Sequence, residues 1–190
     1  TTFVMMDYEP KEDLSGKAGE PLAHQLKVIL KDRFDNPVPN VKVTFKVDQG
    51  GGILIYGPFS GDQVEAKTDE YGEASVGYIL GQEAGERNNI VIASAEQFGG
   101  LSASIVISTL PSDPSQIVIV SGDGQEGKVG TKPPTSLVVS VRDRFDNPIS
   151  GVKVRFENSE IGYVYETETD ENGSARAQYT FGIKAGLQEV

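Results

Sequence analysis

The hexapeptide DRFDNP occupies residues 32–37 and occurs again, unchanged, at residues 143–148. Two interpretations account for a copy 111 positions away. The stretch is a duplicated chemical site, or it is a turn that belongs to a duplicated domain. The flanking sequences favour the domain, because residues 26–47 (LKVILKDRFDNPVPNVKVTFKV) and residues 137–158 (LVVSVRDRFDNPISGVKVRFEN) are identical at 12 of 22 positions.

The correspondence resumes downstream, with the offset shortened by ten residues. The matching segments are TDEYG (68–72) over TDENG (169–173) and YILGQEAG (78–85) over YTFGIKAG (179–186). The first copy therefore carries a ten-residue insertion between Val47 and Thr68. A period near 100 residues fits tandem globular domains. The Pro- and Ser-rich stretch LPSDPS (110–115) interrupts the sequence pattern of the two copies and marks the boundary between them. We therefore expect two domains, residues 1–110 and 111–190.

Within each copy, apolar and polar residues alternate. Residues 41–48 read VKVTFKVD and residues 152–157 read VKVRFE, which is typical of strands with one buried face. Further runs of this kind are 26–31, 74–80, 90–95 and 102–108 in the first copy and 117–120, 137–141 and 175–181 in the second. No window longer than about ten residues has helical spacing. Each copy is therefore predicted to be an all-β sandwich.

Three spaced blocks of the second copy resemble bacterial immunoglobulin-like group 1 domains, the invasin/intimin type. They are VSGDGQEGKVG (120–130), LVVSVRDRFDNPISGVKVRF (137–156) and TDENGSARAQYTFGIKAG (169–186). The first copy shows the same order with LKVILKDRFDNPVPNVKVTF, TDEYGEASVGYILGQEAG and NIVIASA. The resemblance covers nearly the whole chain and implies tandem immunoglobulin-like β-sandwiches, a fold used in arrays that hold an adhesive or enzymatic tip away from the cell.

The resemblance also implies a function. We expect a non-catalytic module of a bacterial cell-surface or secreted protein, and thus an extracellular location, where it acts as a stalk or spacer in adhesion. Its expected partners are neighbouring immunoglobulin-like repeats in the same chain, together with a host or surface protein or a glycan. The alternative is a carbohydrate- or calcium-binding accessory module of a larger extracellular enzyme.

Composition narrows the choice of partners. The net charge of −11 and the pI near 4.6 disfavour nucleic acid and anionic lipid, because both need clustered Lys and Arg. No apolar run approaches the roughly 18 residues that cross a bilayer, so we expect no membrane insertion of this segment. The absence of cysteine excludes disulfides, thiolate metal sites and cysteine nucleophiles.

As a turn, DRFDNP places Asp35 and Asn36 where their side chains can bond the local backbone, and Pro37 fixes φ. Four residues beyond Asn36, Asn40 is replaced by Gly151 in the second copy. Since Asn and Gly accept a positive φ most readily, this exchange predicts a left-handed residue there.

As a chemical site, DRFDNP would bind calcium. The candidate ligands are Asp32 and Asp35 in the first copy and Asp143 and Asp146 in the second. Calcium needs about six to eight oxygen ligands, and the sequence lacks the D-x-[DN]-x-[DN]-G loop with its closing Glu. We therefore favour the turn and expect no cofactor, with calcium as the alternative.

The TDEYG and TDENG segments also read as turns. Asp69 and Asp170 suit the first position of a type I turn, and Gly72 and Gly173 suit its left-handed residue. Catalysis finds no support. His24 is the only histidine and no cysteine is present, so we expect no enzyme and no metal site built on these residues.

The insertion of the first copy, ILIYGPFSGDQ (53–63), is the most individual stretch of the chain. Tyr56 and Phe59 lie around Gly-Pro, and loop aromatics on a rigid sandwich are common recognition residues. Phe98 is a second loop aromatic. These three are the candidates for binding a ligand or partner; the alternative is that they cover the core or the domain junction.

The first copy continues through IASAEQFGGLSASIVISTL (92–110), which has no counterpart before Val190. The second sandwich is therefore expected to lack its last strands and to expose a sheet edge. Two explanations stay open: the strands follow in a longer parent protein, or a partner strand completes the sheet.

Overall fold

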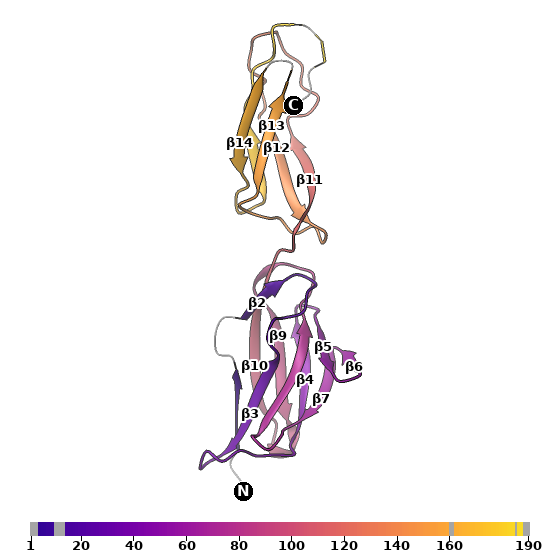
Figure 1. The fold of residues 1–190 in the computed structure, drawn as a ribbon, viewed down its shortest axis with the longest axis vertical. Coiled ribbons are helices and arrows are strands. Elements are labelled where there is room, and N and C mark those ends of the chain that lie inside the picture. Colours follow the sequence, from indigo (N-terminus) through magenta and orange to yellow (C-terminus); the bar gives the residue numbers. More distant parts are fainter. Residues whose placement is uncertain (1–3, 10–13, 160–161, 185, 188–190) are drawn as a thin grey trace. The chain divides into compact units, whose positions relative to one another are not determined.

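A computed structural model describes residues 4–9, 14–159, 162–184 and 186–187. The chain divides into two compact units, Thr1–Pro111 (unit 1) and Ser112–Val190 (unit 2). Both are all-β with the immunoglobulin-like sandwich arrangement (Figure 1). One short 3-10 helix, η1 (Glu96–Phe98), interrupts the strands, and no helix in the described ranges is long and apolar enough to span a membrane.

Unit 1 is built from two five-stranded sheets. In the first sheet the order is β1 (Val4–Glu9), β3 (Leu26–Asp32), β8 (Glu73–Ile79), β5 (Ile53–Tyr56) and β6 (Phe59–Gly61). In the second it is β2 (Leu14–Lys17), β10 (Leu101–Leu110), β9 (Gly85–Ala95), β4 (Lys42–Gln49) and β7 (Gln63–Lys67). Neighbouring strands are antiparallel except β2 and β10, which are parallel.

The alternation seen in the sequence places one residue in two inside unit 1. In β3, Leu26, Val28 and Leu30 are buried, and in β4 Val43 and Phe45 are buried. The hairpin of β9 and β10 adds further inward side chains, which are Val91, Ala93, Ala95, Ile105 and Ile107. Both sheets thus share one core, and burial of these apolar side chains is the main term that stabilises the unit.

Unit 2 repeats part of this plan. A three-stranded sheet has the order β11 (Pro114–Ser121), β12 (Leu137–Asp143) and β15 (Ser174–Ala177). β13 (Lys153–Asn158) and β14 (Tyr163–Glu168) form a second sheet. β11 pairs with β12 as β1 pairs with β3, and β13 pairs with β14 as β4 pairs with β7. The core cluster is smaller and consists of Val141, Val154, Phe156, Ala175 and Ala177.

One predicted strand is shorter than expected. The sequence predicts a strand over residues 175–181, but β15 ends at Ala177. In unit 1 the corresponding end of β8 pairs with β5, at Gly77 and Ile79. β5 belongs to the ten-residue insertion that the second copy lacks, so the end of the predicted strand has no equivalent neighbour to pair with. Alternation alone cannot report this, because a strand also needs a neighbour.

Candidate functional site

The first DRFDNP segment closes a tight turn at the end of β3. Oδ1 of Asp32 accepts hydrogen bonds from the backbone N–H groups of Phe34 (2.8 Å) and Asn36 (3.0 Å). The amide nitrogen of Asn36 also donates to both carboxylate oxygens of Asp32, at 3.2 and 3.1 Å. These bonds hold the pKa of Asp32 below its ordinary value, and the bonds from Asn36 contribute most to the shift. The carboxylate organises the turn itself.

The backbone of this turn uses positive φ at two places. The sequence predicts one at Asn40 and Gly151, and the observed φ values of 60° and 72° confirm it. The other, at Asp35 (68°) and Asp146 (71°), is not predicted by the exchange of Asn for Gly. Asp tolerates the left-handed region better than most residues do.

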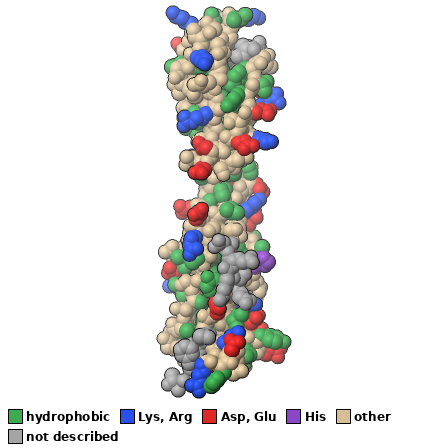
Figure 2. All heavy atoms as spheres, turned by 90° about the vertical axis from the view of Figure 1, so that its left-hand side faces the viewer, with side chains coloured by type: hydrophobic (Ala, Val, Ile, Leu, Met, Phe, Trp, Pro, Cys, Tyr) green, Lys and Arg blue, Asp and Glu red, His purple; other side chains and the backbone are tan. Residues whose placement is uncertain are grey.

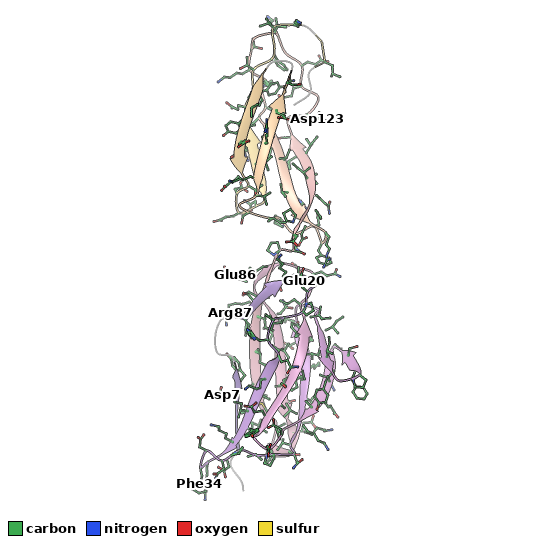
Figure 3. All side chains as sticks on the ribbon, in the orientation of Figure 1. Asp7, Glu20, Phe34, Glu86, Arg87 and Asp123 are labelled. Atoms are coloured by element: carbon green, nitrogen blue, oxygen red, sulfur yellow. The ribbon has the colours of Figure 1, made fainter. Side chains whose placement is uncertain are left out.

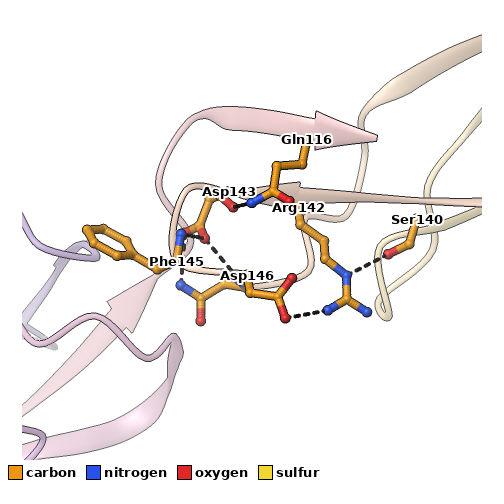
Figure 4. A network of polar contacts seen from close by, with 7 residues as sticks. Gln116, Ser140, Arg142, Asp143, Phe145 and Asp146 are labelled. Carbon is orange, nitrogen blue, oxygen red and sulfur yellow. Dashed lines mark hydrogen bonds and ion pairs between the residues drawn. The ribbon is translucent and has the colours of Figure 1, made fainter. Parts of the chain in front are cut away.

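The second DRFDNP segment forms the same turn with additional contacts (Figure 4). Oδ1 of Asp143 accepts the N–H groups of Phe145 (2.8 Å) and Asn147 (2.9 Å), and Oδ2 accepts Nδ2 of Asn147 (2.9 Å). Oδ2 also accepts the N–H of Ser112 at 2.8 Å, and Nε2 of Gln116 donates to the carbonyl of Asp143 at 3.2 Å. The turn of unit 2 is therefore tied to the first residues of its own chain segment.

The pKa of Asp143 reflects two opposed effects. Burial raises the pKa of this carboxyl, but the hydrogen bonds from Asn147, Ser112 and Phe145 outweigh burial and hold the pKa below its ordinary value. The side chain is thus stable as a carboxylate although it is fully buried. A buried carboxylate that accepts this many N–H bonds has a structural role that an apolar residue could not fill.

The remaining carboxylates of the two turns face cations. Nζ of Lys31 lies 2.9 Å from Asp35, and Arg142 lies 2.8 Å from Asp146. Arg33 and Arg144 stack over the rings of Phe34 and Phe145, at 4.5 and 4.7 Å from the ring centroids; Figure 3 shows Phe34 at the turn beyond the end of β3. In the described part of the chain, no group of three or more His, Cys, Asp or Glu side chains is placed to hold a metal ion.

The TDEYG and TDENG segments are turns, as predicted. Oδ1 of Asp69 accepts the N–H groups of Tyr71 (2.9 Å) and Glu73 (3.0 Å), and Asp170 does the same for Asn172 and Ser174. Gly72 and Gly173 have positive φ values of 74° and 71°. Both carboxylates thus serve their own turn.

The three candidate aromatic residues have different surroundings. Tyr56 and Phe59 face each other across the β5–β6 hairpin and are exposed, Phe59 at 67%. Ile53 and Ile55 on β5 are exposed too, but alternation along the strand puts them on the face opposite Tyr56. Phe98, by contrast, lies in η1 and packs partly buried against the core of unit 1. The structure therefore brings Tyr56 and Phe59 together and places Phe98 elsewhere.

A buried polar network in unit 1 was not visible in the sequence. The hydroxyl of Tyr78 donates to Oδ1 of Asn89 at 2.8 Å, and the amide of Asn89 also donates to the hydroxyl of Thr109. Burial raises the pKa of Tyr78 to about 12. Since β8, β9 and β10 each contribute one of these residues, the network joins the two sheets. No local motif signals it, because the three residues meet only in the fold.

Charged side chains are interspersed over the surface. On the face that Figure 2 shows, Lys and Arg lie among Asp and Glu, and apolar side chains are scattered between them. His24, the single histidine, is exposed.

Comparison with known proteins bears on the fold. No family model matches the chain, and no curated protein matches it. Among solved structures, the adhesin FdeC of Escherichia coli is similar, with a TM-score of 0.54 and 17% identity over 98% of this chain. The match spans 59% of the FdeC chain. This likeness supports the immunoglobulin-like β-sandwich, which is the class of fold that the strand order defines.

Two further solved structures resemble the chain more weakly. The D0–D1 region of intimin has a TM-score of 0.38 and 17% identity, over 95% of this chain and 85% of that one. Domains 4–9 of the surface-layer protein SbsC have a TM-score of 0.42 and 13% identity, over 96% of this chain and 32% of that one. Scores at this level add nothing to the assignment of the fold.

Proposed function

We propose that this chain is a non-catalytic, immunoglobulin-like module of a bacterial cell-surface or secreted protein, and that it acts as a spacer in adhesion. The likeness in fold to the FdeC adhesin is consistent with this role. The observation that carries the proposal is the use of the repeated acidic residues. Asp32, Asp69, Asp143 and Asp170 all accept backbone N–H bonds of their own turns.

A spacer needs a short connection between its modules. In unit 1 the ladder of β10 with β2 runs to Leu110, whose carbonyl accepts the N–H of Ala18 at 2.8 Å. In unit 2 the N–H of Ser112 is bonded to Asp143. Only Pro111, whose φ is fixed by its ring, lies between these two bonded residues. The connection between the two bonded residues is therefore a single residue with a restricted backbone.

Nitrogen-15 relaxation of residues 1–190 in solution tests this proposal. A spacer predicts that both units report one common rotational correlation time, longer than that of either unit tumbling freely. Asp143→Ala should loosen the connection and separate the two values, whereas Asp32→Ala, which removes the equivalent carboxylate far from Ser112 in sequence, should not. Independent tumbling of the two units in the unaltered chain would contradict the spacer role.

A second candidate function is recognition by the β5–β6 hairpin, as in a carbohydrate-binding accessory module. The exposed cross-strand pair Tyr56 and Phe59 favours this candidate. Aromatic side chains present large, rigid contact area at low conformational cost. A glycan array probed with the chain and with the double variant Tyr56→Ala/Phe59→Ala tests it. Binding by the unaltered chain that the variant loses would support recognition. An array without signal would leave the spacer role as the proposed function.

Calcium binding at the DRFDNP turns stays an untested prediction from the sequence. Its test is thermal unfolding with millimolar calcium and with a chelator. A calcium-dependent melting temperature that Asp32→Ala or Asp143→Ala abolishes would support a site, since a ligand of the folded state stabilises it by mass action. We expect no change, because the lone pairs of these carboxylates already accept N–H groups.

A further inference from the structure

One side of β11 is uncovered in unit 2. Ile117 and Ile119 are 63% and 62% exposed and line a groove of about 970 Å³ together with Val139, Phe156 and Tyr179. Their counterparts in unit 1 are Met6 and Tyr8, because Ile117 pairs with Val141 as Met6 pairs with Leu30. Met6 and Tyr8 are partly buried against the core. The same positions are therefore covered in one unit and open in the other.

The structure of unit 1 identifies what covers these positions. β1 contacts β10, and the β9–β10 hairpin lies in the second sheet of unit 1 (Figure 1). The inward residues of this hairpin, Val91, Ala93, Ile105 and Ile107, are fully buried in the core. No strand in the described part of unit 2 occupies the places of β9 and β10. The groove is the space that such a hairpin fills in unit 1.

Two further features of unit 2 point to the same missing neighbour. β4 pairs with β7 on one side and with β9 on the other, whereas β13 has β14 as its only strand neighbour among the described residues. In addition, β2 is a strand because it pairs with β10, and its counterpart, residues 125–128, is not a strand. Both edges that the hairpin joins in unit 1 are thus available in unit 2.

We propose that the groove of unit 2 is a docking site for a β-hairpin from outside residues 1–190, with the inward pattern of β9 and β10. Its first strand would lie antiparallel beside β13, and its second would lie beside the first and parallel to residues 125–128. Backbone hydrogen bonds to the edge of β13 give affinity, and small or β-branched inward residues fit the groove. This inference stands independently of the spacer role.

The chain itself supplies the probe for a test. A fluorescein-labelled peptide with the sequence of residues 85–110 is titrated into the full chain, and binding is followed by anisotropy. We expect saturable binding and slower amide hydrogen exchange, by at least about tenfold, in residues 153–158 of β13. A second peptide carrying Val91→Asp, Ile105→Asp and Ile107→Asp should not bind, because it would place carboxylates in an apolar groove.

Two variants on β11 locate the bound peptide. Ile117→Lys/Ile119→Lys alters the groove side and should weaken binding by at least about tenfold. Val118→Lys/Val120→Lys is the matched control, because these residues are exposed on the opposite face of the same strand and do not line the groove. Circular dichroism of both variants should show that each one folds.

Four outcomes would overturn the proposal. They are no binding, equal binding by both lysine variants, protection confined to unit 1, and peptide-independent dimers in which β13 is already protected. The last outcome would make a second copy of the chain the occupant of the groove. Loss of binding in the groove variant alone, with protection of β13, would establish the site.

Discussion

Asp32 and Asp143 hold the same position in two copies of one turn, yet Asp143 is fully buried and Asp32 is not. The difference comes from Ser112 and Gln116, which bond to the side chain and the carbonyl of Asp143. One sequence motif thus forms an ordinary turn at Asp32, while at Asp143 it also fixes the start of unit 2.

Replacement of Asp143 by Ala should destabilise unit 2 by about 2 kcal/mol, because it leaves several buried N–H groups without an acceptor. Urea unfolding followed by NMR resolves the two units. Asp32→Ala is the matched control and should affect unit 1 less, since its turn is open to water. Equal losses in the two units would mean that the Ser112 bond contributes nothing.

The stability of unit 2 should depend on pH through Asp143. The folded pKa of Asp143 lies below the ordinary value of 3.8, so the unfolded chain binds the proton more tightly. The stabilisation is therefore present above the unfolded pKa and is lost as the pH falls through the folded pKa. The urea midpoint of unit 2 should therefore drop as the pH falls below about 5. Asp143→Asn should reduce the drop, and Asp123→Asn, in the loop after β11 (Figure 3), should leave it unchanged.

Gly173 should not tolerate a side chain. Its φ is 71°, and a Cβ would lie 2.8 Å from the carbonyl oxygen of Val141 and 2.9 Å from the nitrogen of Ile149. Gly173→Ala should destabilise unit 2 by about 2 kcal/mol. Gly151→Asn is the control, because that site has open space and Asn40 adopts the same conformation in unit 1. We expect a change within about 0.5 kcal/mol for the control, measured by thermal unfolding.

Loss of one hydroxyl from the buried network should destabilise unit 1. Tyr78→Phe removes the donor to Oδ1 of Asn89 and should destabilise unit 1 by about 1–2 kcal/mol. Tyr71→Phe, at an exposed turn position, should be neutral. Chemical denaturation of each variant measures the difference. A neutral Tyr78→Phe would show that water or a rearranged Asn89 replaces the hydroxyl.

The sequence predicts the parts of the fold that repeat or alternate. The turns at Asp69 and Asp170 and the left-handed residues at Asn40 and Gly151 follow from residue type alone. The bond of Ser112 to Asp143 does not, because it joins residues 31 positions apart that no local pattern connects.

The alternation pattern also cannot predict where a strand ends. A strand forms where a neighbour exists, which is why β15 is shorter than β8 and why residues 125–128 are not a strand. For the candidate recognition residues, sequence alone could not separate Phe98, which packs against the core, from Phe59, which is exposed. That distinction depends on which side of a loop the core lies.

The ten-residue insertion leaves its surroundings in register: Lys42 pairs with Lys67 in unit 1, and Lys153 pairs with Glu168 in unit 2. The connection between these two strands thus varies in length while the flanking ladder stays the same. It is therefore a natural graft point, and a foreign epitope of similar size built between β13 and β14 should be displayed on an otherwise unaltered scaffold.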